Sequence, residues 1–310
     1  MNTRDIIIET VNKVLVDFNY PVLTLDDNIL PNAEDRSTLF ICSGMQRVRH
    51  RFLESEVGKY SSIQKCIRLQ DIDLVGDDSH ISSFEMIGTF GFNTNDYKIH
   101  QQIWHMIFHE LGIKDKITLI TRHSKMEMEK WGYWQDLGYS TCLADEDCVW
   151  SDGEIGGYCC EVFISHLEIG NLVNPNGNSC DIGFGLERLV QVLEDKSINE
   201  TSLFDTSLSP LARDYKRTLT LLRNQNIYPG AKGVNSVCKK LIRNLIKNNE
   251  TIEGFEDWIE SETNLLNKKF DFINKNITKW ETKPKEYWFE THGISQEDLE
   301  DWFRGKTNAY

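Results

Sequence analysis

The chain has 310 residues, of which 40% are hydrophobic and 26% are charged, a composition typical of globular proteins with a substantial core. It contains no apolar run of 18 residues and no signal-peptide pattern at its N-terminus, so we expect no membrane span and a cytoplasmic location. A net charge of -14 argues against a protein whose whole surface grips nucleic acid, although it is compatible with a local basic groove.

Hydrophobic periodicity predicts a mixture of helices and strands over the first 196 residues. Apolar residues spaced as on one face of a helix predict helices at 5–18, 97–111 and 126–136. Short apolar runs bounded by turn residues predict strands at 38–42, 117–121, 158–165, 167–173 and 181–184. The last of these strands runs into a further helix, in which Leu186, Leu189, Val190 and Leu193 share a face.

The pattern changes after residue 196, where strand signals nearly vanish. Helices are predicted at 207–226, 234–248, 253–276 and 295–303. We therefore predict a mixed α+β domain over residues 1–196 and an all-helical domain over residues 197–310.

The segment 181–188 (DIGFGLER) carries the most informative chemistry. Gly183 and Gly185 leave one face of the strand without side chains, so a ligand can approach the backbone closely. Arg188 lies in the first turn of the following helix, where a guanidinium beside an open glycine surface suits phosphate recognition. Taken alone, the segment is equally well explained as an ordinary strand-to-helix turn with a surface arginine. Arg68, which ends another strand, is likewise explained on its own by a surface ion pair.

Two groups of residues raise the alternative of a metal site. The chain has eight cysteines and no C-x-x-C pair, which favours reduced thiols over a zinc site built from Cys142, Cys148 and Cys159. His105 and His109 have the spacing of metal ligands on one helical face, but no third ligand accompanies them.

Four segments, taken together and in this order, resemble motifs of the alanyl-tRNA synthetases, a family of class II aminoacyl-tRNA synthetases. Residues 39–45 (LFICSGM) look like the first class II motif, 64–68 (QKCIR) with 84–91 (FEMIGTFG) like the second, 167–173 (LEIGNLV) like the family's pocket segment, and 181–189 (DIGFGLERL) like the third motif. A weaker resemblance to the family's tRNA-recognition domain continues at 204–206, 228–243 and 289–293. The family's editing domain and C-terminal domain have no counterpart in these residues.

The resemblance implies an antiparallel sheet flanked by helices, followed by a helical tRNA-recognition domain, and ATP-dependent activation of alanine or another small amino acid. It implies catalytic roles for Arg68 and Arg188 on the phosphates, and an ATP site formed by Arg68, Asp73, Phe84, Glu85 and Arg188, with Phe84 stacked on adenine. It implies an amino acid site formed by Trp150, Asn171, Asp181 and Gly183, in which Asp181 binds the substrate ammonium. It implies Mg²⁺ between the phosphates with Glu161 as its acidic partner, and tRNA contacts from Lys232, Lys239, Lys240, Arg243 and Glu290.

The chain also departs from the family pattern. Gly170 replaces the family's tryptophan before the pocket asparagine, which either enlarges the pocket or lets another side chain fill it. Ala231 and Glu290 replace the family's tRNA-reading asparagine and aspartate. Core packing would equally explain Trp150, and a solvated helix face would explain the lysines of the helical domain.

Three functions therefore stay open at this stage. The first is an alanine–tRNA ligase-like enzyme, and the second is a paralogue that passes the activated amino acid to a carrier protein or a small molecule. The third is a non-enzymatic paralogue, which the joint presence of Arg68, Phe84, Asp181 and Arg188 disfavours because a binding module has no need for all four.

Overall fold

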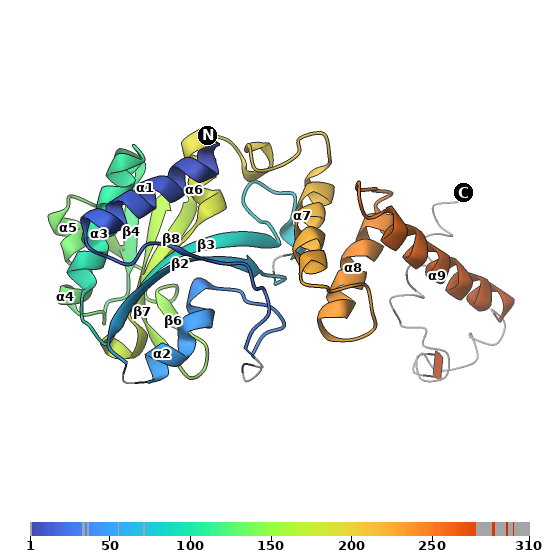
Figure 1. The fold of residues 1–310 in the computed structure, drawn as a ribbon, viewed down its shortest axis with the longest axis horizontal. Helices are drawn as coiled ribbons and strands as arrows, with labels where there is room; N and C mark the ends of the chain where they lie inside the picture. Colours follow the sequence, from blue (N-terminus) through green and yellow to red (C-terminus); the bar gives the residue numbers. More distant parts are fainter. Residues whose placement is uncertain are drawn as a thin grey trace. The chain divides into compact units, whose positions relative to one another are not determined.

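The computed structural model describes residues 2–32, 35, 37–54, 56–70, 72–276, 287, 288, 296 and 300. The chain divides into two compact units, Met1–Asn226 and Ile227–Tyr310. All of the described strands belong to the first unit, whereas the described part of the second contains the long helices α8 and α9 (Figure 1).

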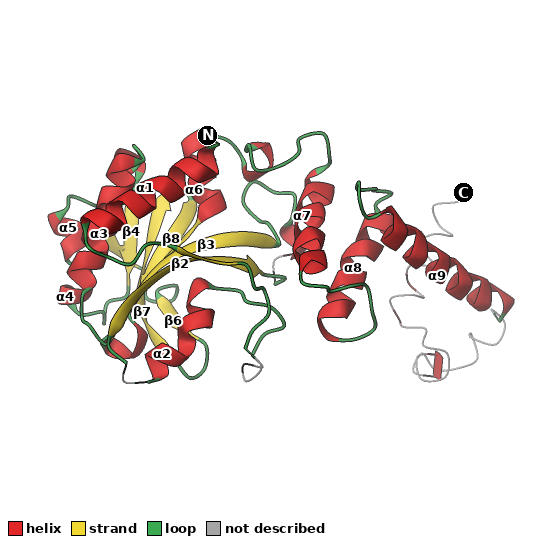
Figure 2. Ribbon diagram, viewed as in Figure 1, coloured by secondary structure: helices red, strands yellow, loops and turns green. Residues whose placement is uncertain are grey.

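The centre of the first unit is a nine-stranded sheet in which most neighbouring strands run antiparallel (Figure 2). Across the sheet the order is β1 (Thr24–Asp26), β2 (Gly58–Ile67), β3 (Ser83–Phe92), β9 (Cys180–Gly185), β8 (Leu167–Val173), β7 (Gly156–Ile164), β4 (Leu119–Arg122) and β5 (Thr141–Leu143), and β6 (Val149–Ser151) pairs with β7 off this path. The pairs β1–β2 and β4–β5 at the two edges are parallel. The predicted antiparallel sheet flanked by helices is thus confirmed.

Three helices cover one face of this sheet: α1 (Thr3–Asp17), α3 (Tyr97–Glu110) and α6 (Leu186–Glu194) (Figure 1). The apolar stripe of α1, including Ile7 and Val11, is fully buried, and α1 contacts both α3 and α6. Trp104 of α3 stacks on Phe184 of β9 with 4.0 Å between ring centroids. Since the helices bury this face, the polar residues of the opposite face are the ones available for chemistry.

Two expected elements differ in the structure. Residues 38–42 are not a strand, although Ile41 makes two isolated backbone hydrogen bonds, donating to Ile29 O at 2.9 Å and accepting from Ile67 N–H at 2.8 Å. A buried apolar run can therefore pack without joining a ladder. The expected helix 126–136 is two short helices, α4 (Met128–Trp131) and α5 (Tyr133–Asp136), which meet at Gly132, a residue of low helix propensity. The remaining short helix, α2 (Arg49–Leu53), lies on the other side of the sheet (Figure 1).

The first compact unit ends at Asn226 rather than at residue 196, because α7 (Pro210–Asn224) packs on the sheet unit. Asp214 of α7 accepts hydrogen bonds from Ser82 at the start of β3, which ties the helix to the sheet. The assignment of residues 1–196 to catalysis and 197–310 to tRNA recognition stays a prediction about function.

In the second unit, α8 (Gly233–Lys247) and α9 (Glu256–Lys275) pack together, burying Leu241 and Leu245 of α8 with Leu266 of α9. The predicted helix 295–303 lies mostly outside the described residues. None of the helices in the described ranges is both long enough and apolar enough to cross a membrane.

Candidate active site

The uncovered face of the sheet presents one continuous row of small and polar residues. Ladder pairing places Gly88 of β3 beside Gly183 of β9, then Asn171 of β8, then Glu161 of β7. In the adjacent row, Asp181 of β9 stands between two apolar ladder partners on β3 and β8. Because side chains alternate along a strand, all of these point to the same face. Gly183 forms a glycine floor between Asp181 and Asn171, whereas the Phe90 ring covers Gly88.

A cavity of ≈ 150 Å³ opens above this floor and brings together five predicted site residues: Arg68, Phe84, Asn171, Gly183 and Arg188. Its other lining residues are Ser79, His80, Ile81, Met86, Glu168, Ile169, Gly170, Gly185, Glu187 and Ile198. The segments that resemble the second and third motifs, 64–91 and 181–189, therefore meet at one cavity although they are far apart in the sequence.

Arg68 and Phe84 form one wall of the cavity. The Arg68 guanidinium donates a hydrogen bond to Cys42 O at 3.0 Å and lies 5.2 Å from the centroid of the Phe84 ring. These contacts leave most of its five N–H donors without a protein acceptor among the described residues. A cation and an aromatic face held side by side suit a ligand that carries both an anionic group and a flat ring.

Arg188 and Glu168 form an ion pair at the same cavity. The Arg188 Nη1 donates to Glu168 O at 2.5 Å and lies 3.1 Å from Glu168 Oε2. A β-bulge at Val162/Phe163 shifts the register of β7 and β8, which turns Glu168 toward the site. Sequence reasoning missed Glu168, because a bulge is a property of strand pairing.

Glu161 lies one strand away from the cavity floor, in surroundings that disfavour a negative charge on its carboxyl group. Burial raises its pKa to about 7, with a further contribution from the Glu168 carboxylate and a smaller opposing effect of Arg188. The carboxylates of Glu161 and Glu168 repel each other, and a divalent cation bound to their oxygens would remove this repulsion.

Asp181 is the most unusual residue on this face. Its side chain is 9% exposed, and among the described residues no group donates a hydrogen bond to it or forms an ion pair with it. Burial alone raises its pKa to about 7. A buried carboxylate without a partner is costly, and here it borders a glycine floor beside Asn171, whose amide likewise makes no hydrogen bond within the described ranges. The arrangement favours an incoming cationic donor.

Besides Asp181 and Glu161, three predicted site residues do not line the cavity. Glu85 points to the helix-covered face, where its oxygens accept hydrogen bonds from Arg4 at 2.6 and 2.7 Å. Asp73 is exposed in a 3-10 turn. Trp150 packs against apolar clusters that include the ladder partners of Asp181, and it lines a second cavity. The ATP roles of Glu85 and Asp73 and the pocket role of Trp150 stay predictions.

The position of the family's tryptophan is filled from elsewhere in this chain. A Cβ on Gly170 would lie 2.4 Å from Gly183 O and 2.4 Å from the Phe184 ring, so no side chain fits there. The Phe184 ring, stacked on Trp104, occupies this space on the helix-covered side. The glycine therefore does not enlarge the cavity, and the second of the two expected outcomes applies.

The alternative metal sites are not assembled. Within the described ranges, no three His, Cys, Asp or Glu side chains are grouped to hold a metal ion. Cys142 is exposed while Cys148 and Cys159 are buried, and His105 instead lies 2.9 Å from the hydroxyl of Tyr139.

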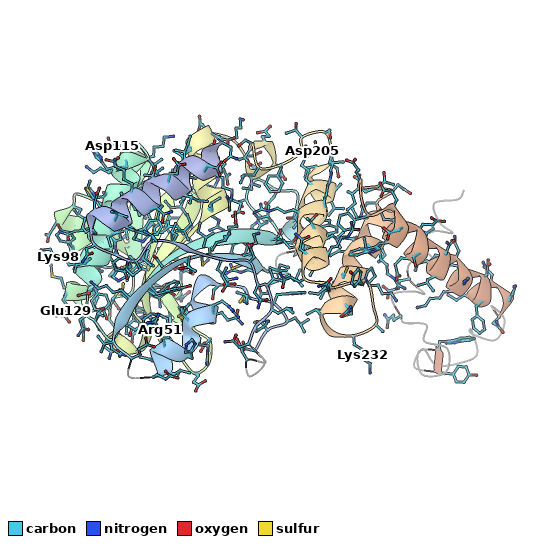
Figure 3. The ribbon with its side chains drawn as sticks, viewed as in Figure 1. Arg51, Lys98, Asp115, Glu129, Asp205 and Lys232 are labelled. Atoms are coloured by element: carbon cyan, nitrogen blue, oxygen red, sulfur yellow. The ribbon has the colours of Figure 1, made fainter. Side chains whose placement is uncertain are left out.

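The predicted tRNA-contacting cations of the second unit differ in their surroundings. Lys232, at the start of α8, is exposed and projects from the ribbon (Figure 3), and Lys240 is also exposed. Lys239 and Arg243 instead face the buried carboxylate of Glu262 on α9, at 3.9 and 3.1 Å. The fifth predicted residue, Glu290, lies outside the described residues.

Comparison with known proteins gives a matching family model, curated relatives and solved structures. A family model described as tRNA synthetases class II (A) matches residues 26–181, half of the chain. The alanine–tRNA ligase of Endomicrobium trichonymphae is 27% identical over 286 residues, covering 71% of this chain and 32% of that protein, and the one of Rhodopirellula baltica is 28% identical over 284 residues, covering 71% and 29%. The chain thus spans about a third of the length of these curated relatives. A solved structure of apo S. aureus histidyl-tRNA synthetase is 12% identical with a TM-score of 0.42, covering 78% of this chain and 82% of that one.

Proposed function

The chain belongs to the class II tRNA synthetases, and from this premise we propose that it activates alanine or another small amino acid with ATP and transfers it to tRNA. The observation that carries the proposal is the buried, unpartnered carboxylate of Asp181 beside the glycine floor. An α-ammonium group is the cation that would satisfy it, through a short charge-assisted hydrogen bond.

The residues of the cavity suit each part of the activation step. A carboxylate oxygen of the amino acid attacks the α-phosphorus of ATP, and the bond to the leaving pyrophosphate breaks. The attacking carboxylate is already ionised at pH 7, so the reaction requires orientation and charge stabilisation rather than a general base. Arg68 would orient the carboxylate and the α-phosphate, and the Phe84 ring beside it would stack on adenine.

Arg188 would bind the distal phosphates once they compete with Glu168 for its guanidinium. Glu168 and Glu161 would then be the protein oxygens for Mg²⁺, an ion that proteins hold with one or two carboxylates plus substrate phosphates. When bound, Mg²⁺ supplies charge neutralisation on the phosphates. At the other end of the site, Asn171 would orient the amino acid against Asp181.

Pyrophosphate exchange into ATP, measured with each common amino acid in turn, tests the activation step. We expect exchange with alanine or another small amino acid, and its loss in Asp181→Ala. A matched control is Asp205→Ala, since Asp205 is an exposed aspartate outside the cavity. If the folded protein with Mg²⁺ gives no exchange with any amino acid, the proposal is wrong.

A separate assay tests whether tRNA is the acceptor, because two of the predicted tRNA-contacting cations, Lys239 and Arg243, pair with Glu262 instead. We expect labelled amino acid to become attached to bulk tRNA in an ATP-dependent reaction. Exchange without tRNA charging would instead favour the carrier protein or small molecule as acceptor.

A further inference from the structure

We propose that Asp214 of α7 is a positioning residue of the nucleotide site, which acts through Ser82 on the backbone that carries Phe84 and Arg68. The inference rests on the proposed use of ATP at the cavity described above. It extends the site to a helix that lies beyond the matched segment 26–181.

Asp214 holds Ser82 by both of its carboxylate oxygens. It is 1% exposed, accepts a hydrogen bond from the Ser82 N–H at 2.8 Å and accepts a second from the Ser82 hydroxyl at 2.5 Å. The same hydroxyl lies 2.7 Å from Thr218 Oγ1, one turn further along α7. Ser82 is thus fixed at its backbone and its side chain by a single helix face.

Ser82 connects the two strands that carry the wall of the cavity. Its carbonyl accepts a hydrogen bond from the Arg68 N–H at 2.9 Å, at the end of β2. Phe84 follows two residues later in β3. Because the Arg68 guanidinium and the Phe84 ring lie only 5.2 Å apart, a shift of Ser82 would move both groups that are proposed to contact ATP.

A second anchor from the same helix lies on the other side of Phe84. The Glu85 N–H donates to both oxygens of buried Glu187, at 2.9 and 3.1 Å. Glu187 in turn forms an ion pair with Arg217 of α7. Phe84 is therefore held between two carboxylate-bound positions, and both connect to one face of α7.

The chemistry of Asp214 indicates a role in geometry rather than simple attachment. Burial raises its pKa to about 6, against the lowering effect of the Ser82 donors and of Arg217. Apolar packing would attach a helix to a sheet with less desolvation than a buried carboxylate requires. Two short hydrogen bonds to one residue instead fix that residue in position and direction.

The test compares Asp214→Asn with Asp205→Asn in the full chain. Asp205, labelled in Figure 3, accepts hydrogen bonds from the N–H and hydroxyl of Ser207 at 3.0 and 2.6 Å, so it binds the same two kinds of donor at an exposed position. Calorimetry measures the dissociation constant of Mg·ATP without amino acid, and pyrophosphate exchange measures the KM of the amino acid. We expect Asp214→Asn to weaken Mg·ATP binding about tenfold and to leave the amino acid KM within about twofold. Asp205→Asn should change neither.

Every result of this comparison either supports or overturns the positioning role of Asp214. Unchanged Mg·ATP binding in folded Asp214→Asn, or a parallel rise of both constants, overturns the positioning role. If Asp214→Asn does not fold, Thr218→Val removes only the hydroxyl contact, and it should weaken Mg·ATP binding about threefold or overturn the inference. Wild-type protein that binds Mg·ATP without any exchange would refute the proposed activation reaction, and the positioning role would then be decided by the calorimetric comparison of Mg·ATP binding. Wild-type protein that does not bind Mg·ATP would refute both.

Discussion

Replacing Asp181 with asparagine should make the protein more stable at pH 8 while abolishing amino acid activation. The carboxylate is buried without a partner, and its pKa is raised to about 7 from the ordinary value of 3.8. Between these two values the folded protein retains a proton that the unfolded chain has released. Asp181 therefore contributes a fall in the free energy of unfolding of the wild type as pH rises from about 4 to about 7, and this contribution stays level above. At about 1.4 kcal/mol per pKa unit, the difference sets an upper bound of about 4 kcal/mol.

Asp181→Asn has the same shape and no charge, so its stability lacks this decline. We expect its advantage over the wild type to grow from near zero at pH 4 toward that bound at pH 8. Urea unfolding of both proteins at four pH values measures the difference, and Asp205→Asn controls for the loss of an aspartate at an exposed site. A difference that stays constant over this range, or a variant that is less stable at pH 8, would refute the account of Asp181.

Three further predictions follow from the same face of the sheet and from α8. Because an ammonium group binds ionised Asp181, the amino acid KM should fall about tenfold between pH 6 and pH 8, and a flat KM profile would contradict this. Gly170→Ala should lower the free energy of unfolding by about 1–3 kcal/mol, because the new Cβ would lie 2.4 Å from the backbone oxygen of Gly183. Gly183→Ala, whose new Cβ would have its nearest contact at 3.2 Å, should fold and raise the amino acid KM. Thermal unfolding and exchange kinetics separate these two glycines. Lys232→Ala with Lys240→Ala should weaken tRNA binding in gel shifts and reduce its salt dependence, and an unchanged salt slope would place the tRNA elsewhere.

Residue patterns that are local in the sequence predicted much of the site. The alternating glycines at 183 and 185 do line the cavity, and Arg68, Phe84 and Arg188 do meet there. Strand alternation could also have shown that Phe84 and Glu85 face opposite sides, which is why Glu85 pairs with Arg4 instead of lining the cavity.

The structural features that the sequence patterns did not predict depend on contacts between segments that are distant in the sequence. Glu168 reaches Arg188 because a bulge shifts the register of two strands, and single-sequence patterns do not reveal bulges. The packing of α7 on the sheet unit is another such feature, since Asp214 contacts Ser82 across 132 residues of sequence. The apolar run at 38–42 has the composition of a strand, but it packs without a ladder partner.

The position of β9 in the sheet has a consequence for synthesis on the ribosome. It is the last strand among the described residues, yet it lies between β3 and β8 and joins β1–β2–β3 to β8–β7–β4–β5. Until residues 180–185 emerge, we expect the facing edges of β3 and β8 to stay unpaired, and unpaired strand edges are templates for pairing with other chains. The strand that closes both edges also carries Gly183 and Gly185 of the cavity lining, so the strand edges are covered and the cavity is completed in one event. Slow translation just before this strand would prolong the exposed state, and chaperones that shield strand edges would act on it there.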